Sequence, residues 1–160
     1  MTDEKPEIDM ELVRQSALIR GETYHAIGEF IAGFSQLEFS IRAVLTAYLN
    51  LPDQYFNAVA GPYDFRMLCA VTSKVGGIKN PERAVQIEAT LKECQSLNDK
   101  RNHIAHGLWN EGLGDDWSVR VLNRNTLETT YVPYSIDELH RLADKAQELM
   151  QRVMGFQGKS

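Results

Sequence analysis

A long helical period between Tyr24 and Asn50 constrains this chain more than any other feature of its sequence. Apolar side chains recur there three and four residues apart, which is the spacing of one face of an α-helix. The residues on this face are Ile27, Phe30, Phe34, Leu37, Ile41, Val44, Leu45 and Tyr48. A long helix with one apolar face must bury that face against other elements. The sequence therefore predicts that the rest of the chain packs along this helix.

The segments on either side of the long helix carry weaker signals. Residues 8–20 show a less regular apolar pattern, and Gly21 either kinks the helix or separates two helices. Residues 51–63 contain two prolines and a glycine, so we expect mainly a connection there.

Two further helices are predicted in the middle of the chain. Asp64 is expected to cap the first, which Gly76 and Gly77 would end. Asn80 and the proline after it suit the start of the second, which is expected to run to His106. Its end would be set by a left-handed glycine at position 107.

The last part of the chain predicts a small hairpin followed by a helix. Residues 117–122 alternate between apolar and polar side chains, residues 127–132 are rich in β-formers, and residues 123–126 form a turn between them. Ser135 and Glu138 have the spacing of a capping box that opens a final amphipathic helix. The expected fold is an all-α helical bundle of four or five helices, with a small β-hairpin inserted before the last helix.

Length and composition bound the organisation of the chain. A chain of 160 residues, 43% of them hydrophobic, fits a single domain over residues 1–160 with frayed ends at about 1–7 and 155–160. The acidic start lacks the pattern of a secretory signal, and no apolar run is long enough to cross a bilayer. We therefore expect a cytoplasmic protein without membrane contact, in which Cys69 and Cys94 are buried, unbridged thiols.

The stretch RNHIAHG, residues 101–107, places polar groups at the end of a helix that is otherwise apolar on one side. Arg101 falls near the middle of the apolar face, and Asn98 lies on the same side. Asn102 and His106 are one turn apart on the border of that face, whereas His103 is expected to point towards solvent.

A guanidinium inside a bundle costs several kcal/mol in desolvation unless it is paired or lines a wet cleft. Glu38 lies in the apolar sector of the long helix, where a lone carboxylate is equally unfavourable. We therefore expect Glu38 and Arg101 to form a buried, bidentate ion pair.

The sequence RNHIAH at residues 101–106 resembles the signature of the HEPN family, which is an arginine, four intervening residues and a histidine, with a polar residue directly after the arginine. The sequence FSQLE at residues 34–38 is also similar to the first core helix of that family. The resemblance implies a small helical bundle that forms a symmetric homodimer. It also implies a metal-independent endoribonuclease without a cofactor, of the kind found in toxin–antitoxin and phage-defence systems, with a minimal nucleotidyltransferase as a possible antitoxin partner.

The resemblance further implies roles for particular residues. Copies of Arg101 and His106 from two chains would face each other across a dimer cleft. His106 would act as a general acid or base while the 2′-hydroxyl of RNA attacks the adjacent phosphate. Arg101 would hold the scissile phosphate, and Asn102 would orient the imidazole or bind a phosphate oxygen. Glu38 and Asn98 would support them.

The charge of the chain limits how it can bind RNA. A net charge of -5 argues against a protein that coats nucleic acid, although it leaves room for a local basic cleft. Lys100, Arg120 and Arg124 are the candidates for contacts with the RNA backbone in such a cleft.

Structural interpretations of the same residues remain open. His106 followed by Gly107 is also an ordinary helix end, and Arg101 can serve the fold through an ion pair alone. Trp109 and Trp117 fit core or hairpin anchors better than base-stacking platforms. His103 and His106 make one HxxH pair, but no second pair of ligands stands at zinc spacing, so no metal site is expected. The alternative to a ribonuclease is a non-catalytic HEPN-like module for dimerisation or for binding a partner or nucleotide.

Overall fold

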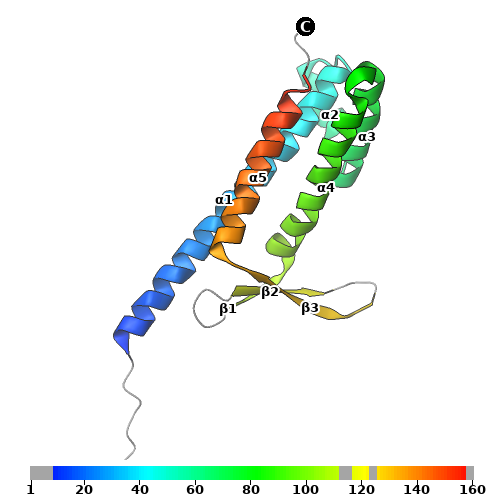
Figure 1. Ribbon diagram of the computed structural model, residues 1–160. Helices are drawn as coiled ribbons and strands as arrows, with labels where there is room; N and C mark the ends of the chain where they lie inside the picture. Colours follow the sequence, from blue (N-terminus) through cyan, green and yellow to red (C-terminus); the bar gives the residue numbers. More distant parts are fainter. Residues whose placement is uncertain (1–8, 112–116, 123–125, 158–160) are drawn as a thin grey trace, which may run out of the picture.

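The computed structural model describes residues 9–111, 117–122 and 126–157, and Figure 1 shows their arrangement. The helices in these ranges are α1 (Met10–Tyr48), α2 (Phe56–Ala60), α3 (Phe65–Lys79), α4 (Ala84–His106) and α5 (Ile136–Met154), with 3₁₀ turns at Asp53–Tyr55 and Pro81–Arg83. The strands are β1 (Leu108–Glu111), β2 (Trp117–Leu122) and β3 (Thr129–Tyr134). The prediction of a mainly helical bundle is confirmed, but the predicted hairpin is one part of a three-stranded sheet.

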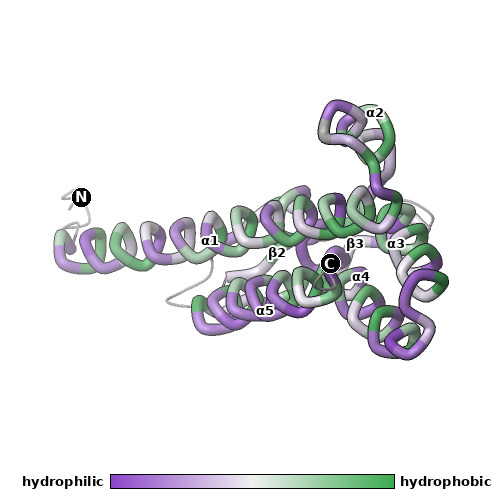
Figure 2. The backbone as a smooth tube through the Cα atoms, turned by 90° about the horizontal axis from the view of Figure 1, so that it is seen from above, coloured by the Kyte–Doolittle hydropathy of each residue, from purple (hydrophilic) through white to green (hydrophobic). Residues whose placement is uncertain are grey.

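Helix α1 is continuous, so Gly21 does not separate two helices. Its start is capped by Asp9, whose side chain accepts hydrogen bonds from the N–H groups of Glu11 and Leu12. α5 lies along the C-terminal half of α1, and the first turns of α1 extend beyond the other helices (Figures 1 and 2). None of the described helices combines the length and the apolar character that crossing a bilayer requires.

The core lies where the predicted apolar face of α1 meets α3, α4 and α5. Phe30, Phe34, Leu37, Ile41, Val44 and Leu45 are each at most 1% exposed. Cys69 and Cys94 are buried and unbridged in this core, as predicted. Burial raises the pKa of the Cys94 thiol to about 12 and also raises that of Cys69. Both thiols are therefore protonated at neutral pH.

The prediction that Gly76 and Gly77 end a helix is wrong, because α3 continues through them to Lys79. The cap at Asp64 is confirmed, since its side chain accepts a hydrogen bond from the N–H of Met67 at 2.7 Å. Gly76 is buried, and a Cβ at this position would lie 2.8 Å from Cε2 of Tyr48. The glycine thus permits close packing of α3 on α1.

The junctions at the two ends of α4 also differ from the prediction. Asn80 makes no side-chain cap, and a 3₁₀ turn precedes the first residue of α4, Ala84. Gly107 follows the helix in extended conformation, with φ -78° and ψ 159°, and is not left-handed. A Cβ on Gly107 would collide with the side chain of Val119. The residue must be glycine because β2 crosses the end of α4 there.

The sheet has the order β1-β2-β3, and both pairings are antiparallel. β1 was not foreseen, since the sequence predicted strands only from residue 117 onwards. The sheet lies across the end of the bundle where α4 finishes and α5 starts (Figure 1). Trp109 and Trp117 pack edge-on with ring centroids 6.2 Å apart, and Nε1 of Trp109 donates to the carbonyl of Ile104 at 3.0 Å. The two tryptophans therefore anchor the sheet to the bundle.

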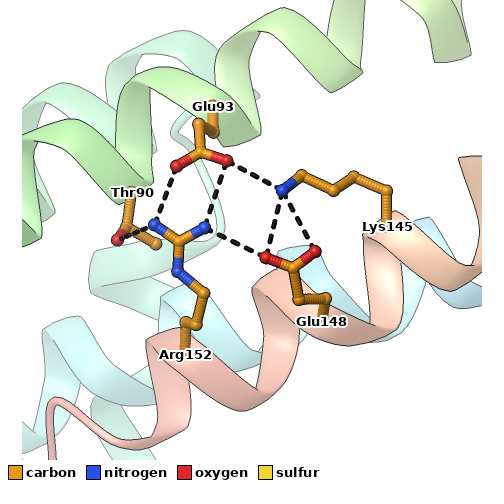
Figure 3. Close-up of polar contacts among 5 residues, drawn as sticks. All are labelled: Thr90, Glu93, Lys145, Glu148 and Arg152. Carbon is orange, nitrogen blue, oxygen red and sulfur yellow. Dashed lines mark hydrogen bonds and ion pairs between the residues drawn. The ribbon is translucent and has the colours of Figure 1, made fainter.

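A polar network joins α4 to α5 (Figure 3). Arg152 donates to both carboxylate oxygens of Glu93, at 2.7 and 3.1 Å, and to Oγ1 of Thr90 at 2.9 Å. Lys145 contacts Glu93 at 2.9 Å and Glu148 at 3.0 Å. The hydrogen bonds from Arg152 and Lys145 lower the pKa of Glu93 from its ordinary 4.5 to about 2. The stability that Glu93 contributes is therefore complete above about pH 4.5 and is lost as the pH falls towards 2.

The last helix begins at the predicted cap and stays packed beyond its own end. Ser135 accepts a hydrogen bond from the N–H of Glu138 at 3.1 Å, as expected for the N-cap. Phe156, in the segment expected to fray, is 2% exposed, and its carbonyl accepts a hydrogen bond from the hydroxyl of Tyr48. Packing thus extends past residue 155.

Two glycine-to-alanine changes test the packing of α3 on α1. Gly76→Ala should lower the free energy of unfolding by about 1–3 kcal/mol, because the new methyl group overlaps the buried ring of Tyr48. Gly21→Ala is the matched control, since a Cβ at that helical position has no neighbour within 4 Å. It should raise the free energy of unfolding by about 0.5–1 kcal/mol. Urea denaturation measures both, and equal effects of the two changes would contradict this account.

Candidate functional site

A pocket of about 750 Å³ lies where the last turns of α4 meet β1 and β2. The residues that line it are Asn102, His103, His106, Gly107, Leu108, Arg120, Val121 and Leu122. Its helical side is polar, and its strand side is largely apolar. The pocket exists because Gly107 lets β2 cross directly over the end of α4.

Three of the residues singled out in the sequence lie together in this pocket. Asn102 and His106 come from α4, and Arg120 comes from β2. Asn102 is half-buried, whereas His106 and Arg120 are exposed. The structure thus brings an amide, an imidazole and a guanidinium to one cavity from two elements.

Arg101 does not line the pocket but holds a residue that does. Its guanidinium carbon lies 5.5 Å from the ring centroid of Phe34, and Nη1 donates to Oδ1 of Asn102 at 3.0 Å. A cation over an aromatic face is stabilised by the quadrupole of the ring. Arg101 therefore reaches the core over Phe34 and fixes the amide of Asn102 at the edge of the cavity.

The predicted ion pair between Glu38 and Arg101 is wrong. Oε1 of Glu38 lies 2.6 Å from Nη2 of Arg42, four residues later on α1. Arg42 also donates to the carbonyls of Ala60 and Tyr63, so it ties α1 to the connection before α3. A partner one helical turn away is reached without crossing the bundle. The presence of Arg42 at this spacing is the sequence signal that was missed.

The remaining predicted residues lie outside the pocket lining. Asn98 is buried in α4 with 6% of its surface exposed, and Lys100 is exposed. Arg124 lies outside the described residues.

His103 is the pocket residue that the sequence interpretation placed wrongly. It was expected to face solvent, but it is half-buried and lines the cavity. Its Nδ1 is buried and has no hydrogen-bond partner within the part of the chain that the structure describes. A helical wheel cannot reveal this position, because the cover comes from the crossing of β2. The spacing from His103 to His106 was nevertheless visible in the sequence and places both imidazoles within one turn.

The electrostatics of the pocket depend on its place at a helix end. The C-terminal end of α4 carries the partial negative charge of the helix dipole, which favours cations and disfavours anions. A bound phosphate would therefore need compensating positive charge. Arg120 supplies a permanent charge, and a protonated histidine supplies a second one.

In residues 9–111, 117–122 and 126–157, no three His, Cys, Asp or Glu side chains gather in a way that could hold a metal ion. The chain matches no protein-family model, no curated protein and no solved structure at a significant level.

The contrast between Arg101 and His106 gives a test of their structural roles. Arg101→Ala should lower the free energy of unfolding by about 1–2 kcal/mol, because it removes the contact with Phe34 and the hydrogen bond to Asn102. His106→Ala should change it by less than about 0.5 kcal/mol, since that side chain is exposed. Urea titrations of both variants measure the difference. An Arg101→Ala protein as stable as His106→Ala would count against the anchoring role.

Proposed function

We propose that this chain is a metal-independent endoribonuclease of the HEPN type that cuts RNA at the pocket between α4 and β2. The observation that supports this most is the meeting of Asn102, His106 and Arg120 in one cavity. The sequence pattern by itself also marks these three residues as catalytic or RNA-binding.

The chemistry needs no group beyond those the pocket contains. The 2′-hydroxyl of a ribose attacks the adjacent phosphate, which gives a 2′,3′-cyclic phosphate and a free 5′-hydroxyl. His106 exchanges a proton with the reacting oxygens, because an imidazole ordinarily titrates near neutral pH. Arg120 binds the phosphate oxygens and offsets their growing negative charge. Asn102, held by Arg101, donates a hydrogen bond from its amide.

Arg101 keeps donors for a second role in this proposal. A guanidinium has five N–H donors, and within the described residues Arg101 donates one hydrogen bond, to Asn102. The others are available to a phosphate or to a second chain. The resemblance would place Arg101 and His106 of two chains in one cleft, whereas the α1 face proposed below lies away from α4 and leaves each pocket within its own chain.

The proposal includes a homodimer formed through the open face of α1 around Phe39. This side chain is 62% exposed and packs on Phe56 of α2 with ring centroids 5.5 Å apart. Hollows of about 450 and 420 Å³ adjoin it. They are lined by Ser35, Gln36, Phe39, Ser40, Ala43, Thr46, Ala47, Leu51, Phe56, Asn57 and Met150. None of these lining residues is charged, and α2 stands off α1 on the side away from α4 and α5 (Figure 2). Such an uncharged, partly apolar surface suits contact with a second copy.

The biological setting of the proposal follows the family resemblance. A ribonuclease of this kind would serve in a toxin–antitoxin or phage-defence system, restrained by an antitoxin such as a minimal nucleotidyltransferase. The net charge of -5 instead favours the alternative, a non-catalytic module that dimerises or binds a protein or nucleotide.

Cleavage of RNA in the presence of a chelator tests the proposed activity. The wild-type protein should cut single-stranded RNA. His106→Ala should cut it at least about 100-fold more slowly, because this change removes an acid–base group. Arg120→Ala should also be slower, since it removes a phosphate contact. His25→Ala is the control, because that exposed histidine lies on α1 outside the pocket lining. The products should carry 2′,3′-cyclic phosphate ends. No cleavage by folded wild-type protein on varied RNAs would assign the chain to the alternative.

Sedimentation analysis of an α1 variant tests the proposed dimer. Wild-type protein should be dimeric at micromolar concentration, and Phe39→Glu should shift it to monomer, because a carboxylate would be buried without a partner. Val85→Glu is the matched control, since this exposed valine lies on α4 outside that face. A monomeric wild-type protein, or a dimer that tolerates Phe39→Glu, would contradict the arrangement.

A further inference from the structure

We propose that His103 is a second catalytic group of the pocket and forms an acid–base pair with His106 inside a single chain. This inference rests on the proposed ribonuclease activity and specifies how each pocket carries it out. It adds a residue of the motif that helical spacing alone places towards solvent.

The first support is the position of the two imidazoles. His103 and His106 are three residues apart on α4, so their Cβ atoms are neighbours on the helix surface at about 5–6 Å. Both line the same cavity, and Arg120 approaches it from β2. A phosphate placed against Arg120 would therefore have two imidazoles on the helical side of the same space.

The second support is the set of groups in the pocket that can exchange protons. Cleavage by a 2′-hydroxyl needs one group to accept a proton and one to donate a proton. Among the residues that the structure describes, those that line the pocket include no carboxylate, thiol or lysine. The arginine and the asparagine do not titrate near neutral pH. The two histidines are thus the acid–base groups among the lining residues.

The third support is the unpaired state of His103. Its Nδ1 is buried without a hydrogen-bond partner in the described ranges, although most buried polar atoms in proteins are paired. A histidine that served the fold alone would gain from a partner at this atom. Within the described residues His106 likewise makes no side-chain hydrogen bond that would occupy it.

The proposed step balances within this set of residues. The bond from O2′ to phosphorus forms as the bond from phosphorus to O5′ breaks. One imidazole takes the proton from the 2′-hydroxyl, and the other, already protonated, gives its proton to O5′. Arg120 faces the phosphoryl oxygens throughout. The two histidines then exchange their protonation states with solvent before the next cleavage.

The experiment uses full-length protein and two chimeric oligonucleotides that contain a single ribose. One has the ordinary O5′ leaving group, and the other has sulfur at that position, which leaves without being protonated. On the oxygen substrate, His103→Ala and His106→Ala should each be slowed about 100-fold or more. On the sulfur substrate, one of the two variants should regain most of the wild-type rate and thereby identify the general acid. The other should stay slow.

Two further variants separate catalysis from folding. His103→Asn places an amide where Nδ1 lies and should keep the thermal midpoint of the wild type while losing the same activity as His103→Ala. His25→Ala should match wild type on both substrates.

The outcomes distinguish the two proposals. One outcome is that the wild type cleaves RNA, His106→Ala does not, and folded His103→Asn cleaves within threefold of the wild-type rate. This outcome overturns the pair and leaves the proposed function standing. The pair is also overturned if the His103 and His106 variants are both slow on the oxygen substrate and the sulfur substrate rescues both of them or neither of them. Absence of cleavage by the wild type overturns the pair and the ribonuclease together.

Discussion

The close crossing of β2 over the end of α4 is the constraint on which the site depends. It requires a residue without a side chain at position 107, because a Cβ there would occupy the space of Val119. The chain can therefore turn from α4 directly into β1 and lay the sheet across the end of the bundle. The same crossing covers His103, brings Arg120 to α4 and encloses the pocket. A helix that simply ended in solvent would carry the same motif without a cavity.

Local patterns in the sequence predicted the elements whose causes are themselves local. The apolar period of α1 and the caps at Asp64 and Ser135 depend on residues within a turn or two, and all three are present in the structure. Gly76 failed as a helix-end signal, because it serves a contact with Tyr48. Gly107 does mark the end of α4, but it serves a contact with Val119 and not a left-handed turn. β1 was missed for the same reason, since its residues become a strand by pairing with β2.

The predictions for the candidate site show the same difference between local and long-range causes. Asn102 and His106 were placed on one edge of α4 by helical spacing, and they do share a pocket. The partner of Glu38 was misassigned because a distant ion pair was preferred to Arg42 at the next turn. Burial of His103 could not be deduced, since it depends on a strand that arrives from another part of the chain. Helical spacing identifies which side chains share an edge, but not what covers them.

The construction of the pocket from a helix end and a docked sheet ties its existence to the integrity of the sheet. Proteins open locally, and a small sheet at the end of a bundle is a candidate for an opening that leaves the helical core intact. In such an opened molecule Arg120 would leave His106, and the cavity would no longer exist. A ligand that requires both walls binds the closed form alone and must therefore stabilise it. Occupancy of the site and protection of the β1 and β2 amides from hydrogen exchange therefore both report on the equilibrium between the closed and the opened sheet.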